Sequence, residues 1–209
     1  HFWFLAQDNN TNYPSFTKTN VFIARFPSLE DLFSEIDNYE EESDDWLDEI
    51  KENIEEIAEI TEEVNLELLK DEELSLESTI KLEQSFEKIE DINKEIEEIK
   101  KNIENIIEQA EKNNLFDENL MEKFDYFQNM LQEMMTPDLL DAINNLKDAM
   151  KNVDSKQLSK ALEDFEFNIE EFEQELDRFI NMFELAKMEQ KLNELSEMIE
   201  NLINKQSNL

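Results

Sequence analysis

Residues 158–186 read LSKALEDFEFNIEEFEQELDRFINMFELA, and this stretch decides the fold class of the chain. Within it, an apolar residue recurs at alternating steps of four and three residues without a miss. The series is Leu158, Leu162, Phe165, Ile169, Phe172, Leu176, Phe179, Phe183 and Ala186. This spacing places apolar side chains on one stripe of a long α-helix, and such a stripe must be buried against other helices.

A second register of the same kind lies nearer the N-terminus. Its apolar members are Leu29, Phe33, Ile36, Leu47, Ile50, Ile54, Ile57, Val64 and Leu68. Glu40, Ser43 and Thr61 fill the remaining positions of the stripe. The polar run Glu40–Asp45 is therefore the weak point of this helix, and it indicates a bend, a gap in the core or a break between two helices.

The bulk composition excludes several classes of function. The chain has 209 residues, no glycine and no cysteine, and its net charge is −36. Without glycine, the loops that cradle phosphates and dinucleotides cannot form. The acidic balance argues against nucleic acid or an anionic membrane surface as a partner, because both are bound through clustered Lys and Arg. No apolar run approaches the ~20 residues of a membrane span.

The pattern predicts helices at 29–70, 76–113, 118–135, 137–152 and 155–204. Thr136-Pro137-Asp138 separates the third from the fourth helix, since Pro is favoured at the first helical position. Those two helices together are about as long as the second, so the chain reads as four arms. Short connections favour antiparallel neighbours. We expect an all-α fold, an elongated antiparallel bundle or coiled coil, with an open structure that dimerises as the alternative.

The register of the last helix slips between Ala186 and Gln190. An apolar 3-4 pattern resumes after the slip, at Leu192, Leu195, Ile199 and Leu202. The slip resembles a stutter, which shifts the phase of a coiled coil locally. We expect this helix to continue to about residue 204.

Residues 1–27 differ from the rest of the chain in being aromatic and nearly free of acid. Phe2–Ala6 and Thr19–Arg25 are predicted strands, joined through a run of turn-forming residues. We expect a short β-hairpin over 1–27, the end of a truncated β-rich domain, followed by the acidic bundle over 28–209.

No constellation of residues points to catalysis, a cofactor or a specific metal site. His1 is the single histidine, so a di-iron bundle built on Glu-x-x-His pairs and a Ser-His-Asp set are ruled out. Clusters such as Glu40–Asp45 could hold Ca²⁺ weakly, although a charge run of this kind is usually a solvated face. We expect a non-enzymatic protein without cofactor, metal or small-molecule substrate, which contacts a protein partner or itself.

Two aromatic residues are candidate partner contacts. Trp46 lies beside the weak part of the first helix, and either anchors a partner or packs within the bundle. Phe167 stands off the apolar stripe of the last helix. The methionines at 130, 134 and 135 form either an adaptable binding surface or ordinary core.

The chain resembles a family of long, uncharacterised bacterial envelope proteins. The residues that carry the resemblance are Phe2–Asn9, Arg25–Glu30, Leu68–Asp71, Met134–Leu139 and Phe165–Leu192. Proteins of that family have transmembrane helices near the N-terminus, an extracytoplasmic β-rich region and a long helical region. The resemblance implies a location on the extracytoplasmic side of the cell envelope, with a membrane anchor outside this chain.

Two functions remain open from the sequence. The first is a structural or scaffold region of a membrane-anchored envelope protein, whose long helices act as a spacer or docking surface. The second is a regulatory binding module or chaperone that holds a basic or unfolded protein in a groove between helices. A spacer requires a closed core, whereas a binding module leaves a large apolar surface open.

Overall fold

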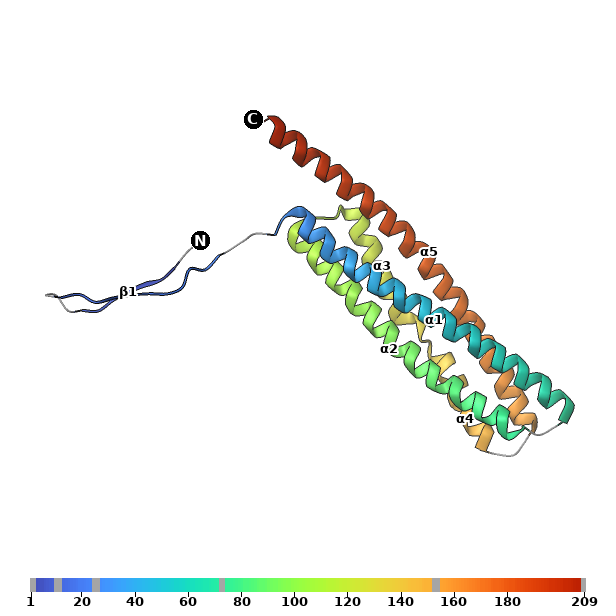
Figure 1. Cartoon of the computed structure of the whole chain (residues 1–209). Coiled ribbons are helices and arrows are strands. Elements are labelled where there is room, and N and C mark those ends of the chain that lie inside the picture. The colour runs from blue at the N-terminus through green and yellow to red at the C-terminus, as the bar shows by residue number, and fades with distance from the viewer. Residues whose placement is uncertain (1–2, 10–12, 24–26, 72–73, 152–154, 208–209) are drawn as a thin grey trace.

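The computed structural model describes residues 3–9, 13–23, 27–71, 74–151 and 155–207. These contain β1 (Leu5–Gln7), β2 (Phe16–Lys18), α1 (Leu29–Asp71), α2 (Leu76–Asn113), α3 (Glu118–Met134), α4 (Pro137–Lys151) and α5 (Ser155–Ser207). The helix ends differ from the expected ones by three residues at most, at the end of α5. The fold is an elongated antiparallel helical bundle with a short N-terminal β-hairpin (Figure 1), as the sequence predicts.

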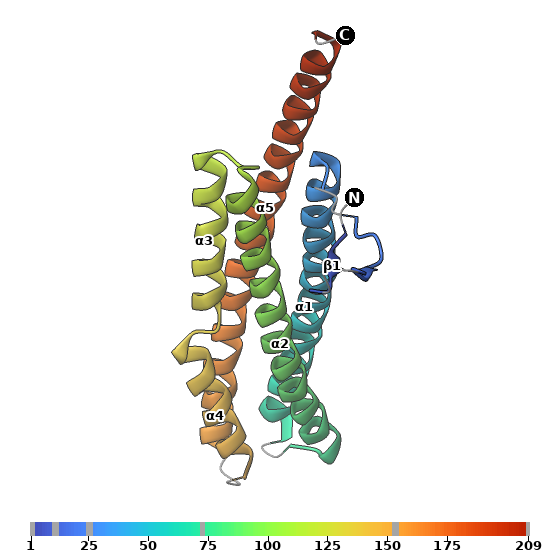
Figure 2. The same ribbon diagram turned by 90° about the vertical axis from the view of Figure 1, so that its left-hand side faces the viewer.

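The bundle has four arms, because α3 and α4 follow each other along one side of it (Figure 2). The break falls at Thr136, whose hydroxyl accepts a hydrogen bond from the Leu139 N–H at 3.1 Å. Pro137 then begins α4 at the first helical position, where its missing N–H costs no intrahelical hydrogen bond. The third arm therefore matches the length of α2 while changing direction in the middle.

Helix α1 is continuous over its 43 residues, so the alternative of a break at Glu40–Asp45 is wrong. Ser43 is fully buried, and its hydroxyl donates to the Tyr39 carbonyl at 2.7 Å. Asn102 of α2 is also buried, and its amide donates to the same carbonyl at 3.1 Å. The polar run thus supplies a polar layer to the core, in which Ser43 is hydrogen-bonded and Oε1 of Glu40 has no partner.

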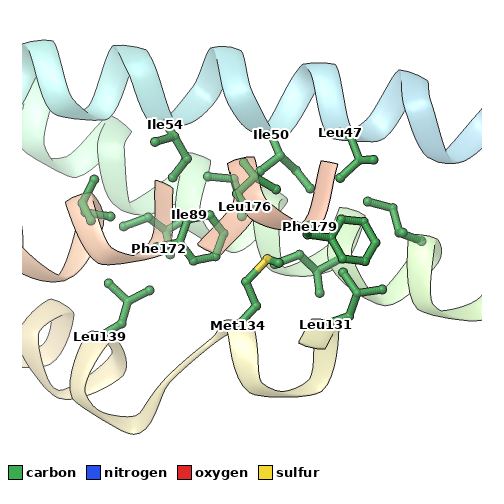
Figure 3. Packing of buried hydrophobic residues seen from close by; sticks show 14 of the residues in the cluster. Leu47, Ile50, Ile54, Ile89, Leu131, Met134, Leu139, Phe172, Leu176 and Phe179 are labelled. Carbon is green, nitrogen blue, oxygen red and sulfur yellow. The ribbon is translucent and has the colours of Figure 1, made fainter. Parts of the chain in front are cut away.

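Aromatic side chains fill the core between α3 and α5. Phe127 packs edge to face on Phe179 and Phe183, with ring centroids 5.6 and 5.7 Å apart. Figure 3 shows Leu176 and Phe179 of α5 between the aliphatic residues of α1 and Leu131 and Met134 of α3. Met130 and Met134 are buried, so these methionines belong to the core.

The hairpin is present, but both of its strands differ from the prediction. The first strand, Leu5–Gln7, lies later than the expected Phe2–Ala6, of which residue 2 is outside the described residues, and the second strand lies earlier than expected. Leu5 pairs with Lys18 and Gln7 with Phe16, so β2 precedes the expected Thr19–Arg25, of which residues 24 and 25 lie outside the described residues. Asp8 explains the shift, because its N–H donates to the Ser15 carbonyl and its carboxylate accepts from the Ser15 N–H, both at 3.0 Å. These bonds start the antiparallel ladder four residues before Thr19.

Candidate interaction surface on α5

The apolar face of helix α5 changes from the inner side of the helix to the outer side near Gln190. Up to that residue its buried side chains follow the predicted stripe, and Phe183, Ala186 and Gln190 are at most 1% exposed. From Leu185 onward a second series of apolar residues faces solvent. It consists of Leu185, Met188, Leu192, Leu195, Ile199 and Leu202, each between 56% and 68% exposed.

The second series lies on the opposite side of the helix from the first. Each of its members stands two residues beyond a position of the buried register, and two residues correspond to a rotation of roughly 200°. A stutter would rotate the stripe by only a small angle. The interpretation of the slip as a stutter is therefore wrong, because the pattern after Gln190 is a new stripe on the outer face.

The inner face of α5 becomes polar where the outer face becomes apolar. Asn193 and Glu197 continue the buried register and are partly covered, as is the neighbouring Glu194, while Leu192 and Leu195 point outward. The last turns of α5 extend beyond the ends of the other helices (Figures 1 and 2). The helix itself continues past the predicted end near 204, to Ser207, and its outer stripe has no partner within the described chain.

The positions that flank the outer stripe carry little negative charge. With Leu192 and Ile199 at heptad position a, and Leu195 and Leu202 at d, the flanking e and g positions beyond Gln190 hold no acidic residue. They are Lys191, Ser196, Met198, Ile203 and Lys205. Residues 185–207 contain four glutamates and three lysines, so they account for only −1 of the net charge of −36.

Ion pairs attach the base of this segment to the bundle. Lys187 pairs with Asp44 and Lys191 with Asp37, which places α5 antiparallel to α1 at this level. Lys123 of α3 pairs with Glu189 on the neighbouring side. These contacts orient α5 as it leaves the bundle, and they hold the outer stripe away from α1 and α3.

The same level of the bundle contains an unusual buried carboxyl. Glu40 lies between Asp37 and Asp44 on α1 and is 5% exposed. Burial, reinforced by the charge of Asp37, raises its pKa from 4.5 to about 8, although Lys187 and Lys191 oppose the shift. Glu40 is therefore mostly protonated at neutral pH.

Gln190 of α5 lies at the same level and is fully buried. Neither its amide nitrogen nor its amide oxygen has a hydrogen-bond partner, and the same holds for Oε1 of Glu40. Lys187 and Lys191 line a pocket of about 350 Å³ beside Glu40. These polar residues of α1 and α5 lie where the closed core ends. The part of α5 beyond Gln190, residues 191–207, is called the free segment below.

The two predicted contact residues have different surroundings. Trp46 is half-buried and packs against the core, in agreement with the alternative that it belongs to the bundle. Phe167 is 59% exposed on the outer face of α5. The intervening outer positions, Glu171, Gln174, Arg178 and Asn181, are polar, so Phe167 is an isolated apolar side chain and not part of the stripe.

The sequence shows Leu192, Leu195, Ile199 and Leu202 as a regular apolar pattern after a register slip, but the pattern alone does not place them on the outer face. Leu185 and Met188 were the signal for the outer face. They already fall on the outer register, while their neighbours Phe183 and Ala186 still fall on the buried register. Two overlapping registers on one helix indicate two separate apolar faces.

Other large apolar side chains are exposed elsewhere on the molecule. The hairpin exposes Trp3, Phe4, Leu5 and Phe16, and the opposite end of the bundle exposes Leu66, Leu69, Leu76 and Ile80. The outer stripe of α5 differs from both because six residues on one helix keep an uninterrupted 3-4 spacing. Scattered apolar residues are ordinary on protein surfaces, whereas a continuous stripe indicates an interaction site.

Within the described ranges, no group of three or more His, Cys, Asp or Glu side chains is arranged to hold a metal ion. Among the helices described, none combines the length and hydropathy that a membrane span needs.

Comparison with known proteins finds no family model, no curated protein and no solved structure that matches this chain. The resemblance to bacterial envelope proteins stays a prediction from the sequence.

Proposed function

We propose that this chain is a non-enzymatic scaffold whose bundle acts as a spacer and whose free α5 segment acts as a docking element. The observation that carries the proposal is that the apolar face of α5 changes from the inner side to the outer side near Gln190. One part of α5 is buried in a closed core, and the next part presents a regular apolar stripe to solvent.

The bundle has the properties that a spacer requires. Its arms pack along their length, and α1 alone is roughly 64 Å long at about 1.5 Å per residue. Acidic side chains cover its outer faces, and like charge opposes nonspecific association. The apolar docking stripe is confined to the part of α5 in which this charge is nearly absent.

A regulatory binding module or chaperone is supported less well by this geometry. That function requires an apolar groove between helices, and the exposed apolar stripe lies on the outer face of a single helix. Trp46, which could have lined such a groove, packs against the core instead.

The location that we propose is the extracytoplasmic side of a bacterial cell envelope, with the chain attached to the membrane through an anchor outside it. This part of the proposal derives from the resemblance of the sequence motifs.

Site-specific photo-crosslinking in the native cell tests the docking role. A photoreactive residue at Leu195 should form a discrete protein adduct, and the same residue at Phe167 should not. The two sites are similarly exposed on the same helix, at 56% and 59%, so accessibility does not separate them. If adducts are absent at Leu195, or equal at both sites, α5 is not a docking element and the proposed function is wrong.

A further inference from the structure

We infer that the outer stripe of α5 pairs with the same stripe of a second copy of this chain, as a short parallel coiled coil. The inference rests on the proposed function, since it names the occupant of the docking element. The second copy is favoured over another partner by the charge, the register and the flanking residues of the stripe.

Charge limits where two copies can meet. Each chain carries a net charge of −36, and pairing through the arms of the bundle would bring two acidic surfaces together. Residues 185–207 carry −1, and Glu194, Glu197 and Glu200 lie away from the stripe at heptad positions c, f and b. The stripe is thus the helical surface on which the repulsion between two copies is smallest.

The residues of the stripe match a two-stranded coiled coil. Position a is occupied by Leu192 and Ile199, and position d by Leu195 and Leu202. In a parallel pair, a β-branched residue at a, here Ile199, together with Leu at d favours two strands over three or four. Because α5 is already helical within the bundle, the free segment extends an existing helix and avoids the cost of nucleating one.

The flanking positions favour the parallel orientation. In a parallel pair, a g residue faces the following e residue of the partner, so Lys191 meets Ser196 and Met198 meets Ile203. The second of these pairs extends the apolar contact. In an antiparallel pair, g positions face each other, and Lys191 would lie near Lys205 with like charge. Only the parallel arrangement avoids this repulsion.

Sedimentation velocity of the purified 209-residue chain tests the pairing. We expect a concentration-dependent dimer of the 25.0 kDa chain. The variant Leu195→Glu should weaken association by at least about tenfold. Phe167→Glu makes the same change at an isolated position on the same helix, and it should leave association unchanged. Circular dichroism checks that both variants stay folded, which their exposed positions favour.

A wild-type chain that remains monomeric up to submillimolar concentration would overturn the inference, as would an equal effect of the two substitutions. If the chain is monomeric while the cellular crosslink at Leu195 captures another protein, the docking role stands and only the identity of the occupant is wrong. If Leu195 forms no adduct and the chain is monomeric, both proposals are wrong.

Single-cysteine variants test the orientation, because the chain has no cysteine of its own. In a parallel pair, Leu192→Cys and Leu202→Cys each oxidise to a disulfide-linked homodimer. If only a mixture of the two variants crosslinks, the strands are antiparallel and the parallel arrangement is wrong.

Discussion

Glu40 is the residue whose ionisation is most strongly opposed by the fold. Its carboxyl lies in the core, with Oε1 unpartnered, and only the partly exposed Lys187 and Lys191 offset its burial. The folded chain binds the Glu40 proton more tightly than the unfolded chain, because burial raises the pKa from 4.5 to about 8. The contribution of Glu40 to stability is therefore fully present below about pH 4.5 and is lost as the pH rises to about 8.

We expect Glu40→Gln to remove this pH dependence. Between about pH 5 and pH 8.5, the wild type should lose on the order of 2–4 kcal/mol more unfolding free energy than the variant. Chemical denaturation at several pH values measures the difference. Glu41→Gln is the matched control, because Glu41 is an exposed neighbour on the same helix. Equal pH slopes for Glu40→Gln and the wild type would show that Glu40 ionises freely in the folded chain.

Glu95 is a second carboxyl with a raised pKa, about 7, caused by partial burial and by the nearby Glu49 and Asp91. Glu95 is present in the wild type and in both the Glu40→Gln and the Glu41→Gln variants. The difference between the wild type and Glu40→Gln therefore isolates Glu40, while Glu95 contributes to the pH dependence that remains.

Helix α5 is one continuous helix with two segments that differ in which face is apolar. Its inner stripe up to Ala186 belongs to the core, whereas its outer stripe from Leu192 to Leu202 contributes nothing to it. The stability of the bundle should therefore be nearly independent of the free segment.

A chain truncated after Glu194 tests this independence. It retains the Lys191 ion pairs with Asp37 and Glu194 and lacks the exposed residues from Leu195 onward. We expect its unfolding free energy to lie within about 1 kcal/mol of that of the Leu195→Glu variant, which removes any effect of association. Thermal and denaturant unfolding measure it, and a loss of several kcal/mol would mean that the segment packs on the bundle.

The five helices, the break before Pro137 and the buried stripe of α5 could all be predicted from the sequence, because spacing and capping are local. Whether a given face of a helix packs against another helix depends on the tertiary structure and not on the local sequence. A 3-4 pattern reports that a stripe exists, but Leu192 and Leu195 have the same spacing whether they face inward or outward. The pairing of the hairpin depends on Asp8 contacting Ser15 across the turn, and a propensity pattern does not contain that contact.

The candidate site was predictable in part for the same reason. Phe167 leaves the apolar register in the sequence, and the structure exposes it, whereas the packing of Trp46 depends on neighbours that the local sequence does not contain. The buried positions of Glu40 and Gln190 depend on α1 and α5 facing each other at one level. Their unpaired atoms could not be inferred from either helix alone.

For the molecule as a whole, repulsion between its negative charges is the main destabilising interaction that solvent conditions can change. The net charge of −36 is confined to a volume that folding makes compact, so self-repulsion opposes the folded state. The ion pairs at the surface offset little of this, since exposed pairs contribute about 0–1 kcal/mol each.

We expect the melting temperature to rise by several degrees between about 20 mM and about 500 mM NaCl, because salt screens the repulsion. Differential scanning calorimetry of the Leu195→Glu variant measures this effect without a contribution from pairing. A melting temperature that falls with salt would mean that attractive ion pairs outweigh the overall repulsion.

The beginning of α1 and the end of α5 lie at the same end of the bundle (Figures 1 and 2), and this arrangement has a mechanical consequence. A force applied between the two would peel α1 from α5 one turn at a time, instead of shearing the whole contact at once. Peeling loads few contacts at any moment, so the bundle should open at low force when it is pulled between those points.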